Sequence, residues 1–190
     1  LKPARIYEQS AGRSRSLEGL KDHKGLIHGN DPTPVVRVKE NNHRFDVDFV
    51  GGQKTGFFLD QRVNREKIGA LARGKTVLNC FCYTGAFSVY AAAGGAKKVV
   101  SVDISKTACA AAAEHLKING FSTDTHPVVE ADVFDYLRGL QENFDLIILD
   151  PPAFAKTKHD VPKASRGYKD INLQAVRHLP QGGLLATFSC

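Results

Sequence analysis

The sequence has no methionine, no tryptophan and only four cysteines among its 190 residues. It also lacks any apolar run approaching the roughly 20 residues that a membrane-spanning helix needs, and its first residues lack the apolar segment of a signal peptide. These absences exclude a disulfide scaffold and argue against a membrane span. Because the chain starts at Leu1 and stops just after an apolar run, we expect it to be a piece of a longer protein.

The four cysteines have no spacing typical of metal ligands; they are Cys80, Cys82, Cys109 and Cys190. Cys80 and Cys82 are separated by a single residue, which is too close for the C-x₂-C pattern of a zinc site. We therefore expect no metal, and we expect reduced thiols in a cytoplasmic protein.

The residues that are present are typical of a folded protein, with 42% hydrophobic and 24% charged side chains. The 26 Lys and Arg residues outnumber the 20 Asp and Glu residues, which gives a formal charge of +6. The positive excess is concentrated in residues 1–24 and 156–177. A chain of this length can form one full domain and a smaller one.

The first part of the chain is expected to form a lead-in and a small domain. Residues 1–33 are interpreted as an irregular, basic linker. Two alternating runs, 34–40 and 43–50, flank Asn41 and Asn42, and asparagine tolerates the left-handed angles of a two-residue hairpin turn. A helix that Asp60 caps and that runs to Ala72 would complete a small α+β hairpin domain over residues 34–73.

From residue 74 onward, short apolar strands alternate with helices. Strands are expected at 76–79, 98–103, 128–131, 144–150 and 183–189, and helices at 85–93, 105–119, 133–140 and 166–179. This alternation predicts an α/β fold with a Rossmann-like, doubly wound, mostly parallel sheet. The predicted second domain spans residues 74–190.

Doubly wound sheets bind ligands at the carboxyl ends of their strands. The loop after the first strand has the single glycine Gly85 where a dinucleotide fingerprint has three, so NAD is disfavoured. Asp103, after the second strand, suits a ribose diol, and Asp132, after the third, could accept from an adenine amino group. Each acid alone is more simply a helix N-cap or a solvated turn. Their joint placement favours a nucleoside without phosphates, S-adenosylmethionine (SAM).

The run 79–87, together with Asp103, Asp132 and the Asp-Pro-Pro-Ala-Phe of residues 150–154, resembles the motif series of class I SAM-dependent methyltransferases. The cofactor contacts expected from the strand ends and this resemblance are Asn79, Phe81, Tyr83, Thr84, Gly85, Asp103, Ile104, Asp132, Val133 and Asp150.

Three further blocks narrow the resemblance: QKTGFFLDQR at 53–62, RGYKDIN at 166–172 and the ending TFSC at 187–190. They are similar to the RlmI-type 23S ribosomal RNA cytosine-C5 methyltransferases, over nearly the whole chain. The resemblance implies a PUA RNA-binding domain before these residues and further sheet strands after them. It implies ribosomal RNA as partner and no membrane, and it leaves a homodimer open.

Cytosine C5 is a poor nucleophile, and a thiolate that adds to C6 makes it reactive. Cys190 follows the fifth strand and Asp150 the fourth. The strand order usual in methyltransferases implies that these two strands are neighbours. Neighbouring strands lie about 4.8 Å apart, so the two side chains could flank one base, with Asp150 assisting proton transfer at N3. A free cysteine is more often a small core residue; the match of Ser189-Cys190 to the family's motif favours the nucleophile.

Two other functions stay open. An Asp-Pro-Pro motif followed by an aromatic residue also serves guanine or adenine N-methylation without a covalent intermediate. A non-catalytic RNA-binding module is the third reading, which the intact set of acids disfavours.

The remaining candidate residues would contact the RNA substrate. Phe154 could stack on a base, and Pro151 would hold the turn after Asp150 rigid. Basic residues could neutralise phosphates; the candidates are Lys54, Arg62, Arg166 and Lys169. The simpler interpretation of these four is a solvated surface with scattered ion pairs. Lys54 and Arg62 could alternatively bind the SAM carboxylate.

Overall fold

The computed structural model describes residues 2–30, 33–52, 55–155 and 157–189. The chain divides into two compact units. The hairpin unit comprises Leu1–Arg37 and Asp46–Phe58, and the sheet unit comprises Val38–Phe45 and Leu59–Cys190.

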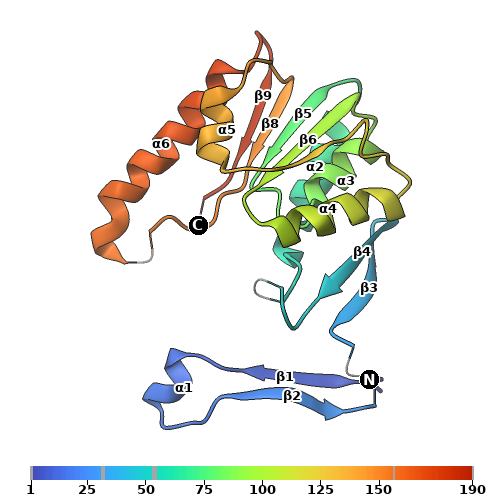
Figure 1. Ribbon diagram of the computed structural model, residues 1–190, viewed down its shortest axis with the longest axis vertical. Helices are drawn as coiled ribbons and strands as arrows, with labels where there is room; N and C mark the ends of the chain where they lie inside the picture. The colour runs from blue at the N-terminus through green and yellow to red at the C-terminus, as the bar shows by residue number, and fades with distance from the viewer. Residues whose placement is uncertain (1, 31–32, 53–54, 156, 190) are drawn as a thin grey trace. The chain divides into compact units, whose positions relative to one another are not determined.

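The sheet unit is built on a five-stranded sheet in the order β7-β6-β5-β8-β9 (Figure 1). Its strands are β5 (Thr76–Cys80), β6 (Lys98–Asp103), β7 (Val128–Glu130), β8 (Leu146–Leu149) and β9 (Leu184–Thr187). Every neighbouring pair is parallel. The chain order reverses at β5, which has β6 on one side and β8 on the other. The predicted doubly wound parallel sheet is confirmed, and β5–β8 is its switch point.

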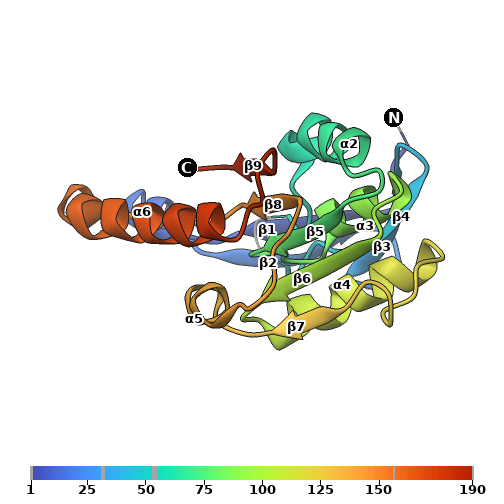
Figure 2. The ribbon, with the colours of Figure 1, turned by 90° about the horizontal axis from the view of Figure 1, so that it is seen from above.

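Helices cover both faces of this sheet (Figures 1 and 2). One layer holds α2 (Arg62–Leu71), α3 (Ala86–Ala93) and α4 (Lys106–Ile118), and the other holds α5 (Val133–Gly139) and α6 (Val161–Arg177). Short 3₁₀ turns, η1 (Leu59–Gln61) and η2 (Lys158–Asp160), precede α2 and α6. Because both faces are covered, all four residues of β8 are buried. None of the helices in the described residues is long and apolar enough to cross a membrane.

The starts of α4 and α2 are capped differently. Ser105 caps α4, with its Oγ accepting the amide of Ala108 at 3.3 Å. Asp60 does not cap α2: it lies in η1, and Gln61 occupies the N-cap position without a side-chain cap. The 3₁₀ turn delays the helix by one residue and moves Asp60 out of capping position.

The hairpin unit corrects the prediction for residues 1–33. β1 (Ile6–Ser10) and β2 (His23–His28) form an antiparallel pair, with the short helix α1 (Arg13–Leu17) between them. The segment is therefore not irregular. Its strands are short and mostly polar, so they lack the apolar alternation by which a sequence reveals a strand. Tyr7 packs edge-on against Phe49, with ring centroids 5.7 Å apart, within this unit.

The second hairpin was predicted and is present. β3 (Val35–Glu40) pairs with β4 (His43–Asp48), and Asn41 and Asn42 have the left-handed φ values of 45° and 73°. Its tip, residues 38–45, belongs to the sheet unit, and so does α2. Whether residues 34–73 fold as a domain of their own stays a prediction.

Candidate cofactor and substrate site

The loop after β5, residues 80–85, is named the cofactor loop after its predicted role, and its backbone is unusual. Phe81, Tyr83 and Gly85 all have left-handed φ values, of 57°, 48° and 75°. Such conformations are uncommon for side-chain-bearing residues and gather at functional sites. A Cβ at Gly85 would lie 2.7 Å from the Cβ of Ala112, so only glycine fits between this loop and α4.

Asp103 ties the cofactor loop to the end of β6. Its Oδ2 accepts the amide of Tyr83 at 2.8 Å, and its Oδ1 accepts the amide of Ser105 at 2.9 Å. A carboxylate has about four acceptor positions, so each oxygen can accept one further bond. Asp103 can therefore hold the loop and receive a ribose hydroxyl at once. Sequence reasoning predicted the second role and missed the first.

Asp132 occupies the N-cap of α5. Its Oδ1 accepts the amides of Phe134 and Asp135 at 2.8 and 3.2 Å, and Oδ2 takes part in neither bond. Asp132 is therefore a helix N-cap, as the simpler interpretation predicted, and its Oδ2 can still accept a hydrogen bond from a ligand. Two neighbouring candidates differ sharply: Ile104 is 67% exposed and can contact a ligand, whereas Val133 is part of the core.

Asn79, which was expected to contact the cofactor, makes a hydrogen bond within the core. It is fully buried in β5, and its Nδ2 donates to Ser88 Oγ on α3 at 2.9 Å. Ser88 Oγ in turn lies 2.7 Å from Ser101 Oγ on β6. Asn79 Oδ1 has no hydrogen-bond partner among the described residues. Asn79 therefore links β5 to α3 through Ser88, and a contact with the cofactor stays a prediction.

Asp150 lies at the switch point, next to the end of β9. Leu149 pairs with Thr187 in the β8–β9 ladder, and the amide of Phe188 donates to the Leu149 carbonyl at 2.9 Å. Gln61 Nε2, from the end of η1, donates to Asp150 Oδ2 at 3.3 Å. Sequence reasoning missed Gln61, although it belongs to the 53–62 block.

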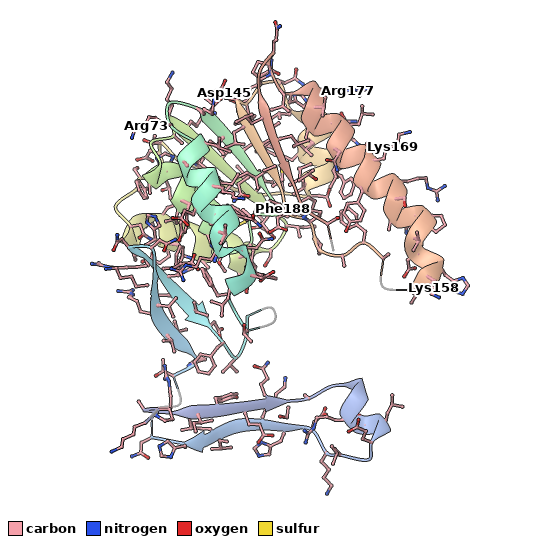
Figure 3. The ribbon with its side chains drawn as sticks, turned by 180° about the vertical axis from the view of Figure 1, so that it is seen from behind. Arg73, Asp145, Lys158, Lys169, Arg177 and Phe188 are labelled. Atoms are coloured by element: carbon pink, nitrogen blue, oxygen red, sulfur yellow. The ribbon has the colours of Figure 1, made fainter. Side chains whose placement is uncertain are left out.

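Phe188 is the first residue after β9 (Figure 3). Its ring packs against Phe87 of α3, with centroids 5.6 Å apart. Two candidate residues, Cys190 and Lys54, lie outside the residues that the structure describes.

The other three cysteines are buried. Burial raises the pKa of the thiols of Cys80 and Cys82 well above the ordinary value, and burial also raises the pKa of Cys109. A thiol with a raised pKa is rarely a thiolate near neutral pH, so all three are poor nucleophiles.

Phe154 belongs to an aromatic cluster. Its ring centroid lies 4.5 Å from Tyr168 of α6, 5.7 Å from Phe134 of α5 and 6.3 Å from Phe81 of the cofactor loop. Tyr168 contributes a buried hydroxyl that has no hydrogen-bond partner among the described residues. Pro151, between Asp150 and this cluster, is buried. The Phe154 side chain is only half-buried in this cluster, and stacking on a base stays a prediction.

The basic candidates lie on two different elements. Arg62, at the start of α2, donates to Asn41 Oδ1 at 3.0 Å and so contacts the hairpin turn. Arg166 and Lys169 are exposed on α6, whose outer side also carries Lys163 and Arg177. Figure 3 shows Lys169 and Arg177 projecting from this helix, with Lys158 just before its start.

The family relationship follows from comparison with known proteins. The model of the S-adenosylmethionine-dependent methyltransferase family matches residues 9–189. The chain is 46% identical to ribosomal RNA large subunit methyltransferase I of Photobacterium profundum, over 97% of this chain and 47% of that protein. It is 49% identical to the protein of the same name from Aeromonas hydrophila, over 97% and 48%. The chain spans about half the length of these curated relatives.

Solved structures agree with this assignment. A methyltransferase, SMU.776, crystallised in complex with SAH, superposes with a TM-score of 0.76 at 37% identity, over 86% of this chain and 44% of that one. A SAM-dependent methyltransferase from Streptococcus mutans gives 0.71 at 34% identity, over 86% and 43%. The parallel sheet, the cofactor loop and the acids at its strand ends therefore have a common explanation: the chain belongs to the S-adenosylmethionine-dependent methyltransferase family.

Proposed function

We propose that the protein methylates C5 of a cytosine in 23S ribosomal RNA, with SAM as methyl donor and Cys190 as covalent nucleophile. The observation that carries the proposal is the pairing of β8 with β9, which sets the strand leading to Ser189-Cys190 beside the strand that directly precedes Asp150. The relatives named ribosomal RNA large subunit methyltransferase support the RNA substrate.

The described residues fit the cofactor. Asp103 keeps acceptor capacity after binding two backbone amides, which suits the ribose diol. Ile104 is exposed beside it and could cover an adenine, whose amino group Asp132 Oδ2 could accept. The backbone of Tyr83, Thr84 and Gly85 would approach the methionine end. When bound, the cofactor supplies an electrophilic methyl group to C5 and leaves as SAH.

The chain's own residues would prepare the base. The Cys190 thiolate adds to C6, forming a C–S bond and moving an electron pair to C5. Asp150 would hydrogen-bond N3 and assist the proton transfer that this addition needs. After methylation a base removes the C5 proton, the electron pair returns to re-form the C5–C6 double bond, and the thiolate is expelled from C6.

Two features favour Cys190 over the other cysteines. It follows Thr187, the last residue of β9, by three residues, so an extended chain keeps it within about 11 Å of the strand end. The other three thiols are buried and have raised pKa values. Attack by any of these would need both deprotonation against that shift and access to a base.

The test is methylation of ribosomal RNA with isotopically labelled SAM, followed by mapping of the product by mass spectrometry. We expect 5-methylcytosine from the wild type and none from Cys190→Ala. Cys109→Ala, which removes a buried thiol from α4, is the matched control and should stay active.

Three results would contradict the proposal. Methyl transfer to a guanine or adenine nitrogen would favour the N-methyltransferase mechanism. Full activity in Cys190→Ala would remove the covalent step. Failure of the wild-type protein to bind SAM in calorimetry would favour a non-catalytic RNA-binding module.

A further inference from the structure

A buried histidine on α4 contacts the cofactor loop. His115 is 2% exposed, and its Nδ1 lies 2.7 Å from the carbonyl oxygen of Thr84. A carbonyl oxygen can only accept, so Nδ1 must carry the proton and donate it. This bond holds the carbonyl group of Thr84, which lies between two residues with left-handed φ values, Tyr83 and Gly85. Conformations of this kind persist only where the surroundings hold them in place.

The other side of His115 meets the tip of the second hairpin. Phe45, fully buried in β4, packs edge-on against the His115 ring, with centroids 5.4 Å apart and planes at 88°. Asn119, just past the end of α4, pairs with the same strand: its Nδ2 donates to the Arg44 carbonyl at 2.8 Å, and its Oδ1 accepts the Arg44 amide at 2.9 Å. The hairpin tip thus contacts α4 and its end through the ring of Phe45 and through the backbone of Arg44.

The tip is also fixed to the other two helices of this layer. Glu40 accepts two hydrogen bonds from Arg65 of α2, both 2.9 Å, and one from the Tyr90 hydroxyl of α3, also 2.9 Å. Continuous contacts therefore run from α2 and α3 through the hairpin tip to His115 and on to Thr84.

We propose that His115 is a positioning residue through which the docked hairpin tip sets the shape of the cofactor loop. It touches neither base nor cofactor; it acts by holding the Thr84 carbonyl. The inference rests on the proposed role of residues 80–85 in cofactor binding. On this proposal, the affinity for the cofactor depends partly on the hairpin tip, which lies about 40 residues before the loop in the sequence.

Two substitutions separate the ring from the hydrogen bond. His115→Phe keeps an aromatic ring against Phe45 and removes the donor, whereas His115→Asn keeps a donor and removes the ring. His126 offers a matched control, because it is also buried, accepts a backbone amide (Val99, 3.2 Å) and packs edge-on against a phenylalanine. It contacts β6 near its beginning, away from the cofactor loop.

Two measurements on each variant test the proposal: the Kd for SAH by calorimetry, and amide hydrogen exchange of residues 81–86. We expect His115→Phe to weaken SAH binding about three- to tenfold, the range that one net hydrogen bond supplies. Exchange in the loop should quicken. His115→Asn should recover most of the affinity, and His126→Phe should change neither quantity. In turnover, His115→Phe should raise the KM for SAM and leave kcat unchanged.

Unchanged affinity and unchanged exchange in His115→Phe would overturn the proposal. Equal losses in His115→Phe and His126→Phe would also overturn it, because they would indicate general destabilisation. If the wild type binds no SAH while exchange in the loop still quickens in His115→Phe, the positioning role stands and the cofactor proposal fails.

Discussion

Arg65 binds the carboxylate of Glu40 through two parallel hydrogen bonds, from Nε to Oε1 and from Nη2 to Oε2, each 2.9 Å long. Both side chains are almost completely buried. The Tyr90 hydroxyl donates to the same Oε1; burial and this bond to Glu40 raise the pKa of Tyr90 to about 12, so it stays a donor. A buried ion pair of this quality is sensitive to the loss of one partner, because the other charge is then left without compensation.

Arg65→Met should therefore lower the free energy of unfolding by about 3–5 kcal/mol, measured by urea titration. The matched control is Glu142→Gln, which breaks the exposed pair that Glu142 forms with Lys98 at 2.8 Å. That change should cost less than about 1 kcal/mol. Equal, small losses in both variants would show that the buried pair does not hold the hairpin tip.

Asp103 and Asp132 should respond differently to the same substitution. Asp103 uses both oxygens for backbone amides, so Asp103→Asn turns one acceptor into a donor that faces an N–H group. We expect a loss of about 1–3 kcal/mol in stability and at least tenfold weaker SAH binding. Asp132 accepts both of its backbone amides with Oδ1, and asparagine caps helices as well as aspartate, so Asp132→Asn should leave the unfolding free energy nearly unchanged. Similar losses of stability from both substitutions would refute this distinction.

Gly85 is constrained by its backbone and by its neighbour. Gly85→Ala combines a left-handed residue with a Cβ placed 2.7 Å from that of Ala112. Gly120→Ala tests the left-handed conformation alone, because φ is +85° there and nothing lies within 4 Å of an added Cβ. Gly120→Ala should cost about 1–2 kcal/mol and Gly85→Ala clearly more. Adding Ala112→Gly should recover part of the difference; no recovery would mean that the close approach is not the cause.

Asp145 should give the protein an acid-dependent stability. Hydrogen bonds from the Thr76 amide and then its hydroxyl, at 2.8 and 2.9 Å, hold the pKa of Asp145 below its ordinary value. The folded state thus binds the proton more weakly than the unfolded state. The stabilisation is complete above the ordinary carboxyl pKa of about 4 and is lost as the pH falls through the lower folded value.

Urea titrations at a series of acid pH values test this dependence. Thr76→Val, which lacks the hydroxyl, should make stability less dependent on pH in this window, whereas Thr76→Ser should retain the wild-type dependence. Identical pH dependence in all three proteins would contradict the assignment to Asp145.

The exposed basic side of α6 should make RNA binding sensitive to salt. Arg166→Gln with Lys169→Gln should weaken binding to ribosomal RNA and reduce the slope of log affinity against log salt by about 1–2. Lys67→Gln with Lys117→Gln, on α2 and α4 of the opposite layer, removes the same charge elsewhere. If the two double variants behave alike, net charge and not the position of α6 accounts for binding.

Much of the sheet could be predicted from sequence because its signals are local. Each strand from β5 onward is a short apolar run beside a helix with a recognisable start, such as Ser105. The asparagines at 41 and 42 identified their turn by the same kind of local chemistry. The place of β9 beside β8 was expected from the strand order usual in methyltransferases, and therefore from the resemblance to that family.

The missed features depend on contacts between distant segments. The buried pair of Arg65 with Glu40 was missed. The two residues are 25 apart in the chain, and nothing local distinguishes Glu40 from an exposed strand residue. The same holds for His115 with Thr84 and for Gln61 with Asp150, separated by 31 and 89 residues.

The left-handed residues of the cofactor loop have a consequence for how this protein can change over generations. At positions 81 and 83, as at 85, the backbone itself restricts which side chains are acceptable, before any contact with a ligand is considered. A β-branched residue there would be strained whatever its polarity. The backbone conformation therefore limits the substitutions that can accumulate at these positions. A variant that keeps every cofactor contact could still be lost through the geometry of its main chain.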